Sequence, residues 1–431
     1  MAIKINNVLD KDYITNLSNK RDEPEWLLDL RLKGLECYKR LPSKVNDKGK
    51  DDYWDIEKFK LDIEPGEISE EELPDEVNSI ISSNIDMRSV LIYGNSSIMF
   101  QHLSEELINR GVIFTSLAKA VKEYPELVKD YLMNSIKFDE DKLLAMHTAL
   151  WDSGVFLYVP QNIEIDFPVQ AIFIGNEGAI LPHVVIVAEA NSRITYVDNH
   201  LSNNSSNTCT HNSITEVFVR EGAKVRIATN NNFNDVSFDY TYRQAIVDKD
   251  GLLEWTVCEM NFGNTISTNT CLLNKSGART DIKTIFIGTE NQKANFTTKV
   301  IHDSDYTQSN ILFRGIMLGT SKGIFNGITK INKGAVKSNA EQTENILMLS
   351  ENARGDANPI LLIDEHDVMA SHAASAGPVN QEDIYYLMSR GIARQEAERL
   401  IIHGFLAPIV SGIPIEGMKE QIEGLIERKL I

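Results

Sequence analysis

Three side chains near the C-terminus have the types and the spacing that a metal site requires. Asp364, His366 and His372 lie within the sequence Asp-Glu-His-Asp-Val-Met-Ala-Ser-His. Their positions differ by even steps, so on one unbroken strand all three side chains would leave the sheet on the same face. Carboxylate oxygen and neutral imidazole nitrogen both bind iron and other first-row metals. The spacing therefore predicts a metal site, and the alternative is that these polar residues only line a solvent-facing strand.

Sulfur and nucleophile chemistry have weaker support in the sequence. The four cysteines, Cys37, Cys209, Cys258 and Cys271, are scattered without a C-x-x-C pair, which predicts neither a disulfide framework nor a four-thiolate metal site. His200 and His211 flank a run rich in serine and threonine, but the chain has no H-E-x-x-H helix. It also has no G-x-x-x-x-G-K-S/T phosphate loop, so any nucleotide hydrolysis must come from a partner.

Composition excludes several classes of protein. The 431 residues include 62 acidic and 43 basic side chains, which give a formal net charge of −19. This charge repels a phosphate backbone, so nucleic acid is not an expected partner. No apolar run approaches the roughly 20 residues of a membrane span, and Met1-Ala2-Ile3-Lys4 leads into polar sequence rather than into a signal peptide. We therefore expect a cytoplasmic protein of two or three domains without membrane contact.

The composition along the chain divides it into three parts. Residues 1–150 alternate helical patterns with linkers and include an acidic connector near 44–76. Residues 151–376 consist of short runs rich in Val, Ile, Thr and Phe, which are typical of strands. Residues 377–431 return to helical spacing. We expect a helical or mixed N-terminal domain, a β core and a helical C-terminal domain.

Polar turns that contain glycine recur between the strand-like runs. The glycines of four such turns, Gly222, Gly251, Gly277 and Gly334, lie 29, 26 and 57 positions apart. The last interval is about twice the first, which indicates one coil of chain every two or three dozen residues, as in a solenoid. Periodicity alone leaves a β-solenoid and a β-sandwich equally open.

A helix with clear end signals follows the histidine segment. Asn380 is a predicted N-cap and Gly391 a predicted C-terminal stop. This helix and the next carry more apolar side chains than a cap for a solenoid end requires, which predicts a docking surface for a partner. The residues concerned are Tyr385, Leu387, Met388, Ile392, Leu400, Ile401 and Phe405.

Four segments, in order along the chain, resemble the SufB/SufD family of iron–sulfur cluster assembly proteins, and within it the SufD branch. Arg21 to Lys33 is similar to the family's NEPEW…RLKAL helix, and Gly154 to Pro160 (GVFLYVP) to the strand that opens its β domain. Ser371 to Ser375 (SHAAS), with the following helix ending in SRGI, and the Arg394 to Phe405 helix complete the resemblance. Four matches in one order are far more specific than any single match.

The resemblance implies a right-handed parallel β-helix flanked by helical N- and C-terminal parts, which decides between solenoid and sandwich. It implies a non-catalytic scaffold subunit that pairs with a SufB-type paralogue through its last coils and docks a SufC-type ATPase on residues 380–431. His372 falls where the family has a histidine implicated in cluster or iron ligation. The resemblance further implies transient iron or an iron–sulfur cluster at the subunit joint and a reduced flavin in the complex, with nothing held tightly by this chain alone.

The sequence departs from the SufB branch at the position of a sulfur-accepting cysteine. This chain has Glu341-Gln342-Thr343-Glu344-Asn345 in that neighbourhood, upstream of His372. Because a thiolate is needed to accept a persulfide, we do not expect this chain to accept sulfur by itself. Two alternatives stay open: a SufB-like homodimeric scaffold, and an unrelated β-helix enzyme that acts on carbohydrates with clustered acids.

Overall fold

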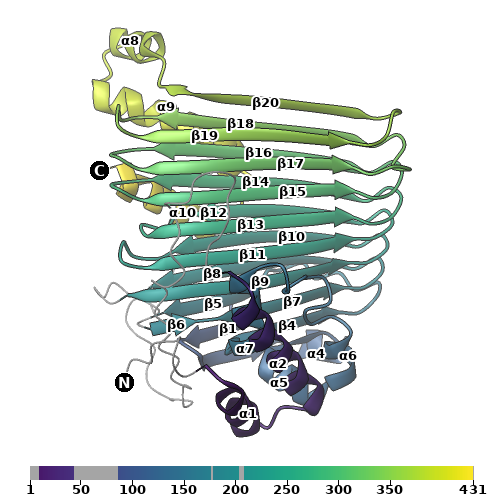
Figure 1. The fold of residues 1–431 in the computed structure, drawn as a ribbon. Coiled ribbons are helices and arrows are strands. Elements are labelled where there is room, and N and C mark those ends of the chain that lie inside the picture. The colour runs from purple at the N-terminus through teal and green to yellow at the C-terminus, as the bar shows by residue number, and fades with distance from the viewer. Residues whose placement is uncertain (1–8, 43–85, 176–177, 203–207, 431) are drawn as a thin grey trace.

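The chain winds into a stack of coils with two long β-sheets, and helices lie against the outside of the stack (Figure 1). The computed structural model describes residues 9–42, 86–175, 178–202 and 208–430. The acidic connector expected near 44–76 lies outside the described residues. From β4 (Ser153–Val159) onward, each strand pairs in parallel with the strand one coil later, and consecutive strands alternate between the two sheets, apart from β6 (Gly178–Ile180). This arrangement confirms the parallel β-solenoid with helical flanks, and the β-sandwich is excluded.

The first sheet has the strand order β2-β1-β5-β8-β10-β12-β14-β16-β18-β20, and the second has the order β19-β17-β15-β13-β11-β9-β7-β4-β3. The strands of the first sheet are β1 (Ser89–Gly94), β2 (Ser97–Leu103), β5 (Val169–Gly175), β8 (Arg193–Ser202), β10 (Lys224–Asn232), β12 (Leu252–Glu259), β14 (Arg279–Gly288), β16 (Gln308–Met317), β18 (Asn339–Met348) and β20 (Met369–Pro378). Those of the second sheet, besides β4, are β3 (Ile113–Ser116), β7 (Pro182–Ala188), β9 (Cys209–Val219), β11 (Phe238–Val247), β13 (Asn264–Leu273), β15 (Lys293–His302), β17 (Lys322–Ile331) and β19 (Arg354–Ile363). The short β6 (Gly178–Ile180) pairs with β9.

The strand registers set the length of one coil. Residues in register along the first sheet advance by 27 to 31 positions per coil, for example Ile227, Trp255, Ile282, Ile311, Gln342 and His372. The first four of these side chains are buried in the core between the sheets. Because alternate residues of a strand face opposite sides, each strand gives one row to this interior and one row to the outside of the stack.

The turns that lead from the second sheet to the first share one backbone conformation between β4 and β18. In each of them a residue with positive φ occupies the equivalent position, at Asn162, Asn191, Gly222, Asp250, Gly277, Tyr306 and Lys337. The N–H of each donates to a carbonyl oxygen of the next coil, as in Gly222 to Lys249 at 2.9 Å and Gly277 to Asp305 at 3.2 Å. Gly, Asn and Asp tolerate this left-handed conformation, and Gly222 and Gly277, two of the four glycines that marked the repeat in the sequence, occupy this position.

Helices from the N-terminal part cover the outer face of the second sheet. Val185, Val187, Ile214 and Phe218 point outward from β7 and β9 and are buried by these helices. The start of the solenoid is also closed by antiparallel strands, since β2 pairs with β1 and β3 pairs with β4. The helices are α1 (Lys11–Lys20), α2 (Glu25–Arg40), α4 (Glu105–Asn109), α5 (Leu117–Glu123), α6 (Pro125–Lys129) and α7 (Lys142–Leu150).

The C-terminal helices lie along the outer face of the first sheet rather than over the end of the stack (Figure 1). Helices α9 (Arg394–Val410) and α10 (Glu416–Leu430) bury outward residues of β8 to β16, among them Ala228, Cys258 and Ile287. Lys429 fixes α10 by donating to the carbonyl oxygen of Ile287 at 2.9 Å. Helix α8 (Gln381–Ser389) projects beyond the last coil. Among the described helices, none is long and apolar enough to cross a membrane.

The last coil leaves both sheets with an open edge. In the described part of the chain, β19 pairs only with β17 and β20 pairs only with β18. Most residues of β20 are exposed. An edge strand presents unpaired N–H and C=O groups, which are a template for another strand.

A buried ion pair at α2 contacts the end of α7, which leads into β4. Arg31 of α2 is fully buried and donates to both carboxylate oxygens of Glu23 at 2.7 Å. It also donates to the carbonyl oxygens of Ala149 and Trp151, and its guanidinium lies 4.5 Å from the centre of the Trp151 ring. Both charged residues belong to the N-terminal segment that resembles the SufB/SufD family.

We predict that Arg31→Ala lowers the free energy of unfolding by about 3–5 kcal/mol, because it leaves Glu23 buried without its partner. Urea denaturation measures the change. The double variant Glu23→Gln/Arg31→Met removes both charges and should lose clearly less than the single variant. A loss of under about 1 kcal/mol for Arg31→Ala would contradict this role.

Candidate functional site at the open end of the solenoid

Asp364 and His366 lie in a turn and not on a strand. Strand β19 ends at Ile363 and β20 begins at Met369, so the expectation of one unbroken strand through Asp364, His366 and His372 is wrong. The chain must cross from the second sheet to the first at this point, and the polar residues form that crossing. Lys337 donates to Asp367 at 2.9 Å, and the N–H of Gly334 donates to Glu365 at 3.0 Å. These bonds tie the turn to the previous coil.

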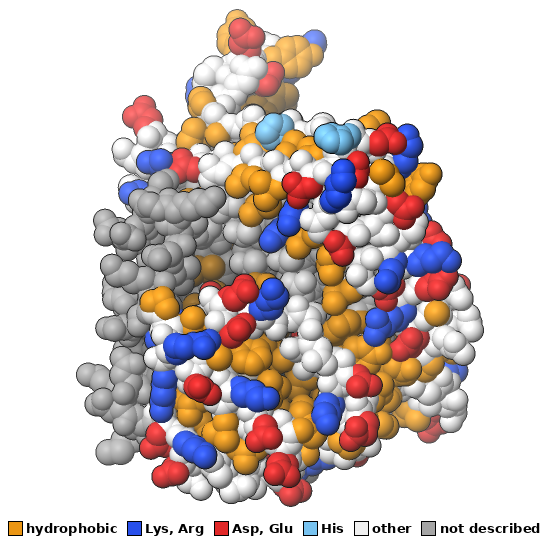
Figure 2. All heavy atoms as spheres, turned by 45° about the vertical axis from the view of Figure 1, so that its right-hand side comes forward, with side chains coloured by type: hydrophobic (Ala, Val, Ile, Leu, Met, Phe, Trp, Pro, Cys, Tyr) orange, Lys and Arg blue, Asp and Glu red, His pale blue; other side chains and the backbone are white. Residues whose placement is uncertain are grey.

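His372 is the member of the three that lies on a strand of the last coil. It is exposed on β20 and stands in register with Gln342, whose side chain is buried between the sheets. His372 therefore belongs to an interior row that has become accessible because no further coil covers it. Figure 2 shows histidine side chains at the surface near the top of the molecule, where the last coil lies.

The described residues contain no group of three or more His, Cys, Asp or Glu side chains that could hold a metal ion. Burial raises the pKa of the Cys209 and Cys271 thiols to about 12, and it also raises that of Cys258. Thiols held protonated inside a core are poor nucleophiles and ligands. The open end thus offers nitrogen and oxygen donors from this chain, and a complete iron site there requires further ligands.

His200 and His211, which flank the run rich in serine and threonine, meet inside the solenoid. His211 Nε2 lies 2.9 Å from His200 Nδ1, and His211 Nδ1 lies 2.7 Å from the Asp239 carboxylate. All three side chains are buried. The one G-x-S-x-G sequence of the chain, Gly319 to Gly323, lies at the turn between β16 and β17, and the hydroxyl of Ser321 is buried without a hydrogen bond. Neither arrangement exposes a nucleophile to a substrate.

The sequence correctly predicted the ends of α8, and the predicted docking residues divide into two groups. The Asn380 side chain accepts from the N–H of Glu382 at 3.0 Å, and Gly391 follows the helix with φ +88°. Tyr385, Met388 and Leu400 are exposed, Tyr385 by 74%. Leu387, Ile392, Ile401 and Phe405 are instead partly buried and hold α8 and α9 against the rest of the molecule.

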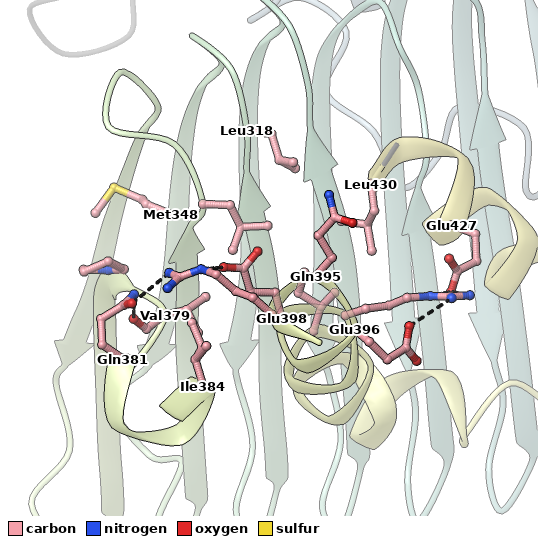
Figure 3. Close-up of a pocket in the computed structure, with 15 residues that line it drawn as sticks. Leu318, Met348, Val379, Gln381, Ile384, Gln395, Glu396, Glu398, Glu427 and Leu430 are labelled. Carbon is pink, nitrogen blue, oxygen red and sulfur yellow. Dashed lines mark hydrogen bonds and ion pairs between the residues drawn. The ribbon is translucent and has the colours of Figure 1, made fainter. Parts of the chain in front are cut away.

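A groove of about 780 Å³ is lined by residues of α8, α9 and α10 together with Leu318, Met348 and Leu349 at the ends of β16 and β18. Figure 3 shows apolar side chains on its walls, including Leu318, Met348, Ile384 and Leu430. Charged pairs cross its rim, because Arg394 donates to Gln381 and Glu398 and Arg399 donates to Glu427, all at 2.8–2.9 Å.

The buried histidines make the stability of the fold depend on pH. His302 is buried between Thr307 and Ser309, whose hydroxyls lie 2.8 Å from its two ring nitrogens, and burial lowers its pKa to about 4. An unfolded histidine has a pKa of about 6.5. Between these two values the unfolded chain binds more protons than the native one, so stability is fully present above the higher value and is lost as pH falls toward the lower.

We predict that His302 alone removes about 2 kcal/mol of unfolding free energy between pH 7 and pH 5. Urea denaturation at the two pH values measures this difference, and His302→Gln should reduce it by that amount. His366→Gln, at an exposed position, is the control and should leave the pH dependence unchanged. Identical pH dependence in wild type and His302→Gln would refute the assignment.

Comparison with known proteins agrees with this architecture. The model of the SUF system FeS cluster assembly, SufBD core domain matches residues 172–405, and that of the SufBD protein N-terminal region matches residues 44–171. The chain is 44% identical, over 98% of both lengths, to iron–sulfur cluster assembly protein SufD of Bacillus subtilis. It is 26% identical to SufBD family proteins of Staphylococcus epidermidis and Staphylococcus aureus, over 95% of this chain and 90% of theirs.

These matches span nearly the whole chain. They exclude the alternative that the chain is an unrelated β-helix enzyme that acts on carbohydrates. They also agree with the resemblance found in the four sequence segments. The chain belongs to the SufBD family of the SUF system for iron–sulfur cluster assembly.

Proposed function

We propose that this protein is the SufD-type scaffold subunit of an iron–sulfur cluster assembly complex in the cytoplasm. The observation that carries the proposal is the open end of the solenoid, where β19 and β20 each lack a second neighbour among the described strands. The 44% identity to the Bacillus subtilis SufD protein supports the same reading. In this role the chain is non-catalytic, and it positions other subunits and their cargo.

A SufB-type paralogue is the proposed partner at the open end. Its own last coil would supply strands to β19 and β20, which satisfies backbone groups that are otherwise left to water. In the absence of the paralogue, a second copy of this chain could use the same edges, which is the basis for a homodimer in isolation. The joint then lies beside His372 and the turn that carries Asp364 and His366.

A SufC-type ATPase is the proposed partner of the C-terminal helices. Tyr385, Met388 and Leu400 expose apolar surface on α8 and α9, and large exposed side chains of this kind commonly anchor interfaces. Helix α8 projects beyond the last coil and lies beside the groove lined by Met348 and Ile384 (Figure 1). Movement of α8 by a nucleotide-driven partner would therefore not require the coils themselves to unfold.

The proposed cargo at the joint is iron or a transient iron–sulfur cluster. His372 offers an exposed imidazole at the joint, and neutral imidazole is a suitable iron ligand. Burial keeps the thiols of Cys209, Cys258 and Cys271 protonated, and the fourth cysteine, Cys37, lies on α2 at the opposite end of the stack (Figure 1). We therefore propose that a partner delivers the sulfur. We propose no cofactor held tightly by this chain alone, and a reduced flavin belongs to the assembled complex.

We predict that Tyr385→Ala/Met388→Glu weakens binding of the ATPase subunit at least about tenfold, because it removes two exposed apolar anchors. Calorimetric titration of the purified full-length chain with the ATPase subunit measures the affinity. Ile108→Glu, at an exposed apolar residue of α4, is the control and should bind normally. Unchanged affinity of the double variant would move the docking site elsewhere.

We predict that His372→Ala sharply reduces cluster formation while folding and subunit assembly are preserved, since an exposed imidazole contributes little to packing. Iron and sulfide contents of the complex after anaerobic reconstitution provide the measurement. His366→Ala tests a histidine of the neighbouring turn and should have a milder effect. Full and equal cluster yield in both variants would leave His372 without a role as a ligand.

A further inference from the structure

Three strands of the second sheet present a basic outer face near the open end of the stack. On β15, β17 and β19 the outward positions alternate with interior ones such as those of Phe296 and Phe325. Asp356 is the one acidic side chain at these outward positions, and it pairs with Arg354 at 3.0 Å. The face therefore carries an excess of positive charge in a chain whose formal net charge is −19. Its basic residues are Lys293, Lys299, Lys322, Lys330 and Arg354.

Apolar side chains lie between these charges, and the helices stop short of them. The row that contains Lys299 continues on the next two strands as Ile328 and Ile360, and both isoleucines are partly exposed. Among the described residues, Ile266 of β13 is the last outward residue of this sheet that belongs to the cluster buried by the N-terminal helices. In Figure 1, none of the labelled helices lies over β15, β17 or β19.

The acidic connector has the composition that this face fits. Residues 61–76 contain eight acidic side chains and no lysine or arginine. Leu61, Ile63, Ile68 and Leu73 are interspersed with these acids. Partly exposed isoleucine among lysines suits a segment that offers both acidic and apolar side chains.

The chain enters the connector within reach of this face. Lys142 donates to the carbonyl oxygen of Leu41 at 2.9 Å, and Leu41 packs in the same cluster as Ile266. From β13 to β19 there are three strand spacings, about 14 Å in all. At roughly 3.3 Å per residue, residues 43–85 reach about 140 Å when extended. Residues 61–76 can therefore lie on the face while the chain still returns to β1.

The outer face of the first sheet is the competing surface, and acids lie among its basic residues. Arg226 pairs with Glu254 at 2.8 Å, and Lys283 pairs with Asp281 at 2.9 Å. Helices α9 and α10 already bury part of this face. The connector also leaves α2 on the side of the second sheet, so the basic face of β15, β17 and β19 is favoured.

We propose that residues 61–76 bind the outer face of β15, β17 and β19, with their carboxylates beside Lys299, Lys322 and Lys330. Complementary charge orients the segment, and contact with the isoleucines removes apolar surface from water. Because the segment belongs to the same chain, its acids are held near the face at a high effective concentration. This contact is independent of the scaffold role, and it keeps the basic face from binding other acidic proteins.

Zero-length cross-linking of the full-length chain with a carbodiimide tests the contact without any substitution, because it joins a carboxylate to a lysine amine only where the two touch. Mass spectrometry should find links from residues 61–76 to Lys299, Lys322 or Lys330. Lys224, which is exposed on the first sheet, is the internal reference and should give no link to residues 61–76. A mixture of isotopically labelled and unlabelled chains separates links within one chain from links between copies.

The charge-reversal variant Lys322→Glu/Lys330→Glu should release the segment. We expect a glutamate-specific protease to cleave between Glu64 and Glu72 about fivefold faster than in wild type, because two attractions become repulsions. The matched control, Lys224→Glu/Arg279→Glu, makes the same change of charge on the first sheet and should be cleaved at the wild-type rate. Added salt should bring the wild-type rate toward that of the variant, since it screens exposed charges. A free peptide of residues 61–76 corrects for the effect of salt on the protease.

Four results would overturn the proposal. They are the absence of links from residues 61–76 to the face, links that form only between copies, equal cleavage of wild type and Lys322→Glu/Lys330→Glu, and the same acceleration in the control. Thermal midpoints show whether the two variants are folded. If the variant on β17 does not fold, the cross-links of the wild-type chain decide the question.

Discussion

Each strand of this protein depends on the strand of the next coil for its backbone hydrogen bonds. Parallel pairing repeats from β4 to β20, and the turn N–H groups continue the same ladder outside the sheets. Through this repetition the backbone groups of interior coils find hydrogen-bond partners on both sides. Those of the last coil find them on one side only. The C-terminal helices do not cover this open edge, because α9 and α10 lie along the first sheet. The position of the site follows from this unsatisfied edge.

The alternation of side chains along each strand gives the solenoid two kinds of surface with separate uses. Outward rows are buried by the N-terminal helices on one sheet and by the C-terminal helices on the other. Inward rows form the core, and they become accessible only at the final coil. His372 thus reaches solvent from an interior position, whereas His200, His211 and His302 stay sealed in earlier coils. The same residue type serves structure in the middle of the stack and is available for chemistry at its end.

The sequence predicted the repeat and the ends of α8, because each has a local signature. Glycine at Gly222 and Gly277 marks turns that need positive φ, and Asn380 caps α8. It misplaced Asp364 and His366, since even spacing cannot reveal that a turn interrupts the strand. It also gave no sign that Glu344 faces the interior, because both faces of β18 carry polar residues. Inward and outward rows are distinguished only by the way the coils stack.

The two ends of the stack differ, and this difference limits how copies can assemble. At the start, β3 is only four residues long and the Gln101 side chain of β2 donates to the Phe114 carbonyl oxygen, so these edges offer little to an incoming strand. A head-to-tail contact between copies, which would propagate into a filament, therefore lacks one of its two surfaces. When the open ends of two copies pair with each other, the assembly is complete after two subunits, and both open edges of each copy are paired. The asymmetry of the solenoid thus favours a finite, approximately twofold particle over a fibre.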